Sequence, residues 1–192
     1  MSGLRAAPQI TTPRLVLREW RDGDRDTFAA MNGDPRVSEF LVGPVTPADS
    51  DDMVDRIERC WRERGYGLWA AERRDSGAFI GYVGLWPATF DAPFTPAVEV
   101  GWRLAYTHWG NGFATEGATE ALRLGFEVMG MPEIVSFTAH RNIRSIRVME
   151  RLGMRRDPYC DFDHPAFEPD DPSRQHVLYR LSRADWLETP GG

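Results

Sequence analysis

Lysine is absent from this chain of 192 residues, and all 23 of its basic residues are arginine. That absence excludes a Schiff-base lysine and a P-loop lysine from its chemistry. A basic excess is missing too, because 29 acidic residues give a formal net charge of −6, which argues against nucleic acid as a partner. An acidic body instead favours a cationic ligand such as an amine.

Cysteine is scarce, and long apolar runs do not occur. Cys60 and Cys160 lie far apart and share no metal-ligand spacing, so we expect reduced thiols in a cytoplasmic protein and no bound metal. No apolar run is long enough to cross a membrane, and the first residues show no signal-peptide pattern. With 42% hydrophobic and 27% charged residues, the chain is typical of one soluble globular domain that needs no disulfide.

Hydrophobic periodicity predicts the order strand, two helices, three strands, helix, strand, helix, strand. The expected strands are 15–17, 68–72, 79–86, 98–104, 133–139 and 175–181, and the expected helices are 22–32, 46–65, 114–129 and 142–153, with 34–43 as a loop or short helix. Asp22 or Asp24 opens the first helix, and Thr46, followed by Pro47, is the predicted N-cap of the second. This order predicts an α/β (α+β) fold with a mixed sheet covered by helices.

The most informative segment is the glycine-containing turn 109–115, between a predicted strand and a predicted helix. Unpaired N–H groups at this helix start would form a pyrophosphate site; they belong to Asn111, Gly112, Phe113, Ala114 and Thr115. A dinucleotide fingerprint fails, since it needs glycine at position 115 and an acidic residue after the next strand. A structural turn without a ligand stays open. Glu116 would repel a phosphate unless its side chain points away.

The predicted helix after Asn142 carries a second basic feature. Its arginines fall on one face and suit phosphate groups, and the opposite face is expected in the core; the arginines are Arg144, Arg147 and Arg151, and the core residues are Ile146, Met149 and Leu152. Two other interpretations remain open. The arginines could form a solvated helix face, and Asn142 could simply be an N-cap.

These motifs together resemble the GNAT superfamily of N-acetyltransferases, in its Rim-type branch, which includes the ribosomal-protein-alanine acetyltransferases. The turn 109–115 is similar to the superfamily's phosphate turn, with Trp109 in place of the usual Gln or Arg. Further matching segments follow in the same order along the chain: 12–18, 34–37, 99–102, 142–145, 152–154, 179–181 and 185–186. The resemblance covers a single domain at 10–187, with loose tails at 1–9 and 188–192.

The resemblance implies a splayed, mostly antiparallel sheet flanked by helices, with acetyl-CoA between the strands ending at Leu104 and Ala139. The pantetheine arm would pair with the backbone of Trp102, Arg103 and Leu104, like an added strand. The pyrophosphate would sit on the turn 111–115. Asn142 would bind the pantetheine arm. Of the arginines on one face of the helix after Asn142, Arg147 is the one expected to contact the cofactor.

The resemblance also implies direct acetyl transfer without a covalent acyl-enzyme. Glu99 is the candidate general base; an ion pair with a neighbouring arginine is the alternative, and His108 and His140 are weaker candidates for the base. The family's usual acid, a Tyr, corresponds to Met149, so Ser145 is the expected substitute, with Tyr159 a further possibility lacking positional support.

The acceptor site is expected on the other side of the sheet gap, lined by Phe40, Trp86 and the loop 90–94. The acceptor would be a small-molecule amine or a peptide N-terminus, with no nucleic acid and no membrane as partner, in a monomer or homodimer. Two rival hypotheses remain: a non-catalytic acyl-CoA-binding or regulatory module with the same fold, and a structural domain without a nucleotide ligand.

Overall fold

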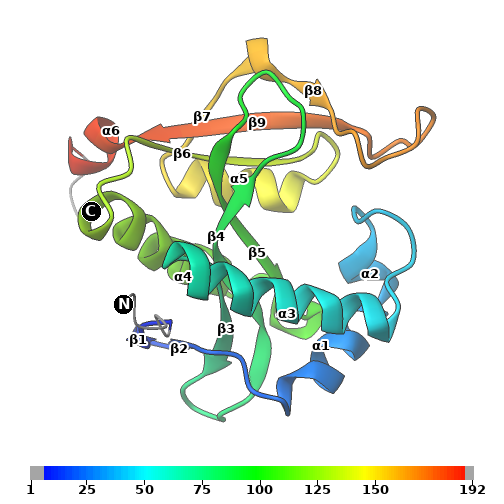
Figure 1. The fold of residues 1–192 in the computed structure, drawn as a ribbon, viewed down its shortest axis with the longest axis vertical. Coiled ribbons are helices and arrows are strands. Elements are labelled where there is room, and N and C mark those ends of the chain that lie inside the picture. The colour runs from blue at the N-terminus through cyan, green and yellow to red at the C-terminus, as the bar shows by residue number, and fades with distance from the viewer. Residues whose placement is uncertain (1–6, 189–192) are drawn as a thin grey trace.

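One sheet runs through the molecule, with helices on both of its faces (Figure 1). The structure is a computed structural model that describes residues 7–188. Within those residues the strand order is β1-β2-β3-β4-β5-β6-β9-β7, with β8 paired to β9. Every pair is antiparallel except β5 with β6, which run parallel. The predicted α+β fold, a mixed and mostly antiparallel sheet flanked by helices, is confirmed.

The elements follow the predicted order, with several short ones added. The strands are β1 Ile10–Thr11, β2 Leu15–Arg18, β3 Leu68–Arg73, β4 Phe79–Ala88, β5 Ala97–Leu104, β6 Glu133–Ala139, β7 Arg155–Arg156, β8 Phe162–Asp163 and β9 Gln175–Ser182. The helices are α1 Asp24–Asn32, α2 Pro35–Ser38, α3 Pro47–Arg64, α4 Phe113–Arg123, α5 Ile143–Arg151 and α6 Arg183–Glu188. Short helical turns cover Tyr106–His108 and Pro158–Cys160. Each described helix is too short or too polar to cross a membrane.

Helix α3 begins as the sequence predicts. Thr46 Oγ1 accepts a hydrogen bond from the Asp49 N–H at 3.1 Å, and Asp49 Oδ2 accepts one from the Thr46 N–H at 2.9 Å, which completes a capping box. Helix α1 differs from the expectation. It begins at Asp24, and its N-cap position is Gly23, which has no side chain to cap the helix. The Asp24 carboxylate instead accepts a hydrogen bond from Arg18 Nη1 at 2.7 Å.

Helix α4 approaches the sheet closely, because its inward face is made of small residues. A Cβ at Gly117 would lie 2.6 Å from Val83 Cγ1 on β4, and Ala118, Ala121 and Leu122 are fully buried. The helix was predicted to continue to 129. Instead the α-helix ends at Arg123 and the chain widens into a π-helical turn over Leu124–Val128.

The two ends of the described chain are anchored by side chains. The Ala7 N–H donates to Glu19 Oε1 at 3.0 Å, and the Pro8 carbonyl accepts from Trp69 Nε1 at 2.8 Å. At the other end, Glu188 closes α6. The remainder of the expected tails, 1–6 and 189–192, lies outside the described residues.

The parallel pair of β5 and β6 creates the feature that matters for function. A single register pair, Glu99 with Val135, joins these strands, whereas β5 pairs with β4 along its whole length. Beyond Glu99 the two strands diverge. Within residues 7–188, the backbone of Trp102–Leu104 therefore has no strand partner on the β6 side.

Candidate functional site

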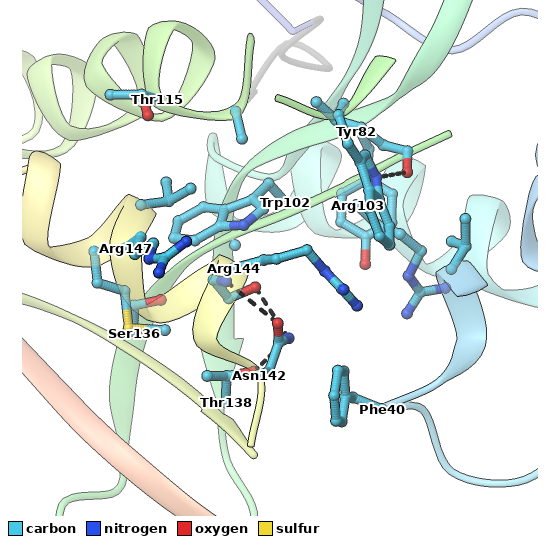
Figure 2. A pocket seen from close by; sticks show the side chains of 18 of the residues that line it. Phe40, Tyr82, Trp102, Arg103, Thr115, Ser136, Thr138, Asn142, Arg144 and Arg147 are labelled. Atoms are coloured by element: carbon cyan, nitrogen blue, oxygen red, sulfur yellow. Dashed lines mark hydrogen bonds between the residues drawn. The ribbon is translucent and has the colours of Figure 1, made fainter. Parts of the chain in front are cut away.

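A cavity of about 500 Å³ lies where β5 and β6 separate (Figure 2). Eleven of the twelve predicted site residues line it: Glu99, Trp102, Arg103, Leu104, Gly112, Phe113, Ala114, Thr115, Asn142, Ser145 and Arg147. Asn111 is not a lining residue. Its side-chain Nδ2 donates to the carbonyls of His108 and Trp109 at 3.2 and 2.9 Å. Phe40 and Trp86 also line the cavity, as expected for the acceptor side.

The loop 90–94 does not reach the cavity. Phe90 and Phe94 instead pack with Phe137 and Phe162 in a second, smaller hydrophobic core. The prediction of an acceptor wall there was wrong, because the short strand β8, which brings Phe162 to this cluster, has no periodic signal in the sequence.

The turn before α4 leaves its hydrogen-bond donors available. Gly110 and Gly112 have φ values of 75° and 80°, which only glycine adopts at little cost, and no side chain caps the start of α4. Thr115 Oγ1 is buried without a hydrogen-bond partner among the described residues, and its hydroxyl lies on the cavity side of α4 (Figure 2). A helix start with free donors and an unsatisfied buried hydroxyl fits an anion.

Glu116 points away from this anion site. Its Oε1 accepts from Thr12 Oγ1 at 2.5 Å and from the Arg14 N–H at 2.8 Å, and its Oε2 accepts from Arg14 Nε at 2.7 Å. Burial acts to raise the pKa of Glu116, but these hydrogen bonds outweigh it and the pKa is lowered. Arg14 also donates to the Asn111 carbonyl at 2.8 Å and so ties β2 to the turn. Sequence reasoning missed Arg14.

Asn142 is the N-cap of α5. Its Oδ1 accepts from the Ser145 N–H at 3.2 Å, and its Nδ2 donates to Thr138 Oγ1 at 3.0 Å and to Ser145 Oγ at 3.1 Å. Both amide protons are therefore engaged, and one lone pair of Oδ1 remains for a ligand N–H. Because Ser145 Oγ accepts from Asn142, its own O–H is free to donate.

The arginines of α5 all line the cavity, as expected if this helix face binds phosphate groups. Arg144 is already paired, since its Nη2 lies 2.7 Å from Glu39 Oε2 and its guanidinium 4.5 Å from the Trp109 ring centre. Arg147 and Arg151 form no ion pair within residues 7–188 and are exposed. The face below them is core, with Met149 1% and Leu152 8% exposed.

The two faces of β5 point to different parts of the molecule. Trp102 pairs with Val83, which packs against α4, so this face belongs to the side of α4 and α5. Arg103 pairs with Tyr82 and donates to Asn32 on α1, so the other face belongs to α1. Glu99 shares the face of Arg103 by strand alternation. Arg103 can therefore meet a cofactor on the α4 side only through its backbone.

Glu99 lies half-buried in the cavity and forms no hydrogen bond or ion pair with any described residue. The surrounding chain desolvates its carboxyl group, which raises the pKa to about 8. The alternative of an ion pair with an arginine is therefore not what the structure shows. A carboxyl group with a pKa near physiological pH, open to a cavity, is suited to accept a proton from a substrate.

The titratable side chains that line the cavity besides Glu99 are not the set that the sequence predicted. His108 lines the cavity and burial lowers its pKa, whereas His140 is exposed and outside the lining. His176 on β9 and Tyr82 on β4 also line it and were missed. Burial lowers the pKa of His176 to about 4 and raises that of Tyr82, so both are neutral near pH 7. Tyr82 lies four residues before Trp86 and therefore on the same face of β4. That spacing could have predicted Tyr82 as a second cavity residue.

Two further side chains stand apart from the cavity, the sequence candidate Tyr159 and the cysteine Cys60. Tyr159 is 96% exposed and is not a lining residue. Cys60 is buried in the core, and burial raises its thiol pKa to about 11. Within the described residues, no cluster of His, Cys, Asp and Glu side chains is arranged to hold a metal ion.

One cavity joins a helix start with free donors to a carboxyl group that has no partner among the described residues, an arrangement that suits group transfer from a phosphate-containing donor. Residues 14–155 match the family model described as the acetyltransferase (GNAT) domain. The chain belongs to the GNAT family of acetyltransferases, whose members use acetyl-CoA.

Similar proteins agree with this assignment. The chain is 32% identical over 154 residues to YkkB of Bacillus subtilis, and the matched region covers 79% of this chain and 87% of that protein. It is 28% identical over 193 residues to the FsC-acetyl coenzyme A-N(2)-transacetylase of Aspergillus fumigatus, covering 96% of this chain and 80% of the other. The crystal structure of an acetyltransferase from Agrobacterium tumefaciens has a TM-score of 0.73 at 28% identity, covering 91% and 94% of the two chains.

Proposed function

We propose that this enzyme transfers the acetyl group of acetyl-CoA directly to a primary amine held against Glu99. The observation that carries the proposal is the continuity of the cavity, which joins the donor-rich turn before α4 to the unpaired Glu99 carboxyl group. We also propose that it belongs to the Rim-type branch, because the motifs at 12–18, 109–115 and 142–145 resemble that branch. A cytoplasmic location is proposed on a separate ground, the two free cysteines.

The residues around the cavity fit acetyl-CoA. The N–H groups at the start of α4 and the unsatisfied Thr115 hydroxyl would hold the pyrophosphate, and Arg147 would neutralise part of its charge. The open backbone of Trp102–Leu104 would pair with the amides of the pantetheine arm. The remaining lone pair of Asn142 Oδ1 would accept from one of those amides.

Glu99 and Ser145 supply the proton transfers in this proposal. The amine must lose a proton to attack the thioester carbonyl, and the Glu99 carboxylate takes it directly or through water. As the carbon–nitrogen bond forms, the carbon–sulfur bond breaks and the departing thiolate receives a proton. Ser145 is the donor we propose, because its hydroxyl can hydrogen-bond to the departing sulfur and Met149 occupies the position of the family's usual tyrosine. As its proton passes to the sulfur, the serine oxygen takes a proton from water, so the hydroxyl is restored. The acceptor is a small amine or a peptide N-terminus.

Calorimetry and a thiol-release assay test the proposal together. We expect acetyl-CoA to bind with micromolar affinity or better, and CoA thiol to appear in step with an acetylated amine when a panel of amines and peptides is supplied. Absence of binding at high micromolar acetyl-CoA would contradict the cofactor site. Tight binding with no turnover across the panel would contradict catalysis and favour the acyl-CoA-binding module.

A further inference from the structure

The charge that lines the cavity is opposite in sign to the charge of the protein. The chain as a whole carries a formal net charge of −6. The described cavity lining, in contrast, contains one acidic residue, Glu99, and several arginines: Arg36, Arg103, Arg144, Arg147 and Arg151. A polyamine acceptor would need a second carboxylate for its distal ammonium group, and this lining offers none.

Most of these arginines already form an ion pair or have a proposed role at the phosphates. Arg144 pairs with Glu39, and Arg147 and Arg151 project from α5 on the side proposed for the phosphates. Arg36 donates to both carboxylate oxygens of Asp34, at 2.9 and 2.6 Å, which lowers the pKa of Asp34 to about 2. These interactions leave Arg103 as the cavity arginine on the Glu99 face of β5 without a carboxylate partner among the described residues.

Neutral groups hold the Arg103 side chain in place. Its Nη1 donates to Asn32 Oδ1 at 2.9 Å, and its guanidinium carbon lies 5.3 Å from the Tyr82 ring centre. Asn32 is 1% exposed, and its Nδ2 donates to Ser50 Oγ at 2.9 Å, which itself donates to the Thr46 carbonyl at 3.2 Å. This chain of hydrogen bonds fixes the guanidinium without neutralising it. Of the five N–H donors of arginine, a single one has an acceptor within residues 7–188.

On this face of β5 the residue between Glu99 and Arg103 carries no side chain. Gly101 separates the two residues on the same face of β5, and a Cβ there would lie 3.5 Å from Glu99 Oε1. The glycine therefore leaves a shallow passage along the strand from the carboxyl group to the guanidinium. Apolar side chains line the same end of the cavity: Val37, Phe40, Leu41, Met53 and Trp86.

We propose that the acceptor is an amine that also carries a carboxylate, and that Arg103 binds this carboxylate while the amine lies against Glu99. The acceptor class is then that of amino acids and related amino-carboxylates with an apolar body, and Arg103 is its specificity-determining residue. The inference rests on the proposed acetyl transfer, and it assigns the second anchor of the same substrate. A guanidinium fork is the side chain best suited to a carboxylate.

Matched acceptor pairs test the inference. Thiol release is measured with L-phenylalanine against L-phenylalaninamide and with 6-aminohexanoate against hexylamine, for the wild type and for Arg103→Gln and Arg103→Lys. We expect the wild type to prefer the carboxylate member in kcat/KM by roughly 10- to 100-fold, the worth of a hydrogen bond to a charged group. Arg103→Gln should abolish this preference, chiefly through KM, and Arg103→Lys should restore part of it.

Arg36→Gln is the matched control, because it removes a cavity arginine whose charge is already balanced by Asp34. Its preference between the members of each pair should stay that of the wild type. The comparison of ratios between variants cancels the different basicities of the amines. An unchanged acetyl-CoA dissociation constant in Arg103→Gln, together with a thermal transition that stays cooperative, excludes a general loss of structure. The transition should move to a lower temperature, because Asn32 Oδ1 loses its donor.

The failure of this inference can be distinguished from that of the proposed function. An enzyme that acetylates amines with equal efficiency in both members of each pair, or that prefers spermidine, overturns the carboxylate inference and leaves acetyl transfer intact. A preference that survives in Arg103→Gln overturns the role of Arg103. An enzyme that binds acetyl-CoA and uses none of these amines overturns both proposals.

Discussion

The two faces of β5 present opposite kinds of chemistry to one cavity. On the side of α4 and α5 the groups are main-chain donors, glycines at positive φ and exposed arginines, which suit a large and highly charged ligand. On the side of α1 the groups are the half-buried carboxyl of Glu99, which has no partner in the part of the chain that the structure describes, and a guanidinium held by a neutral amide. The first face provides binding through backbone geometry, and the second provides reactivity through side chains removed from water. Substitutions on the two faces should therefore affect different kinetic constants.

The largest expected effect is on the α1 face. Glu99→Gln should lower kcat by roughly 10²–10⁴-fold, because it removes the proposed proton acceptor. Steady-state kinetics and calorimetry should show this loss with an unchanged acetyl-CoA dissociation constant. Glu133→Gln, which alters an exposed glutamate on β6 paired with Arg180, is the control and should keep normal turnover. Normal turnover in Glu99→Gln would remove Glu99 from the mechanism.

The matching substitution on the α4 face is Gly112→Ala. A side chain at φ 80° costs about 1–2 kcal/mol, so the turn should shift its donors. We expect acetyl-CoA affinity to fall about tenfold, equivalent to about 1.4 kcal/mol, with little change in kcat. Gly130→Ala, at φ 67° and outside the cavity, carries the same backbone strain and should lose stability only. Equal affinity losses in the two variants would show that strain alone is responsible.

The pH dependence of stability sharpens the comparison further. Burial raises the folded-state pKa of Glu99 from 4.5 to about 8, so the folded protein keeps a proton that the unfolded chain releases. This contribution to stability is fully present below pH 4.5 and is lost as pH rises through about 8. Urea unfolding should therefore show Glu99→Gln gaining stability relative to the wild type between pH 5 and pH 8.5. Parallel pH curves would contradict the raised pKa.

The same group predicts the pH dependence of catalysis. The Glu99 carboxylate, as proton acceptor, is present in increasing amount as pH passes about 8, so kcat/KM should rise through that range. In Glu99→Gln the residual activity should lack this step. A rise of equal size in the variant would assign the pH dependence to the amine.

The smallest expected effect concerns the ion pair beside the phosphate turn. Arg14→Ala should leave the Glu116 carboxylate without its cationic partner near the start of α4 and weaken acetyl-CoA binding about two- to fivefold, the size of a partly exposed ion pair. The double variant Arg14→Ala/Glu116→Gln should recover affinity, because the repulsive charge is gone. Calorimetric acetyl-CoA dissociation constants of the wild type, of both variants and of Glu116→Gln alone form a double-mutant cycle. No recovery in the double variant would show that Arg14 acts through the Asn111 carbonyl instead.

Local signals explain which parts of this structure could be predicted from the sequence. Thr46 and Asn142 cap their helices, and the segment 109–115 forms the expected turn, because each depends on neighbours within a few residues. Strand alternation was also enough to assign Glu99 to one face of β5. The mixed sheet covered by helices followed from the order of the elements, whereas the gap between the strands ending at Leu104 and Ala139 was expected from the resemblance to the GNAT superfamily.

Contacts between distant segments could not be predicted in the same way. Arg14 meets Glu116 across 102 residues, and Arg103 meets Asn32 across 71. The end of α4 at Arg123 depends on how Gly125 packs against Ile134, Leu85 and Met131, where a Cβ would clash. The second aromatic core assembles around β8, a strand too short for a period. In each case tertiary packing decides the outcome, and residue identity alone does not encode the partner.

The single register pair between β5 and β6 has a thermodynamic consequence. A donor molecule lying in that gap would hydrogen-bond to β5 and contact α5, which follows β6. It would therefore stabilise the two parts of the sheet relative to each other. Any ligand that binds only the folded state raises the unfolding free energy by RT ln(1 + [L]/Kd). The lifetime of this enzyme in the cell would then follow the supply of acetyl-CoA, and a starved cell would hold less of it.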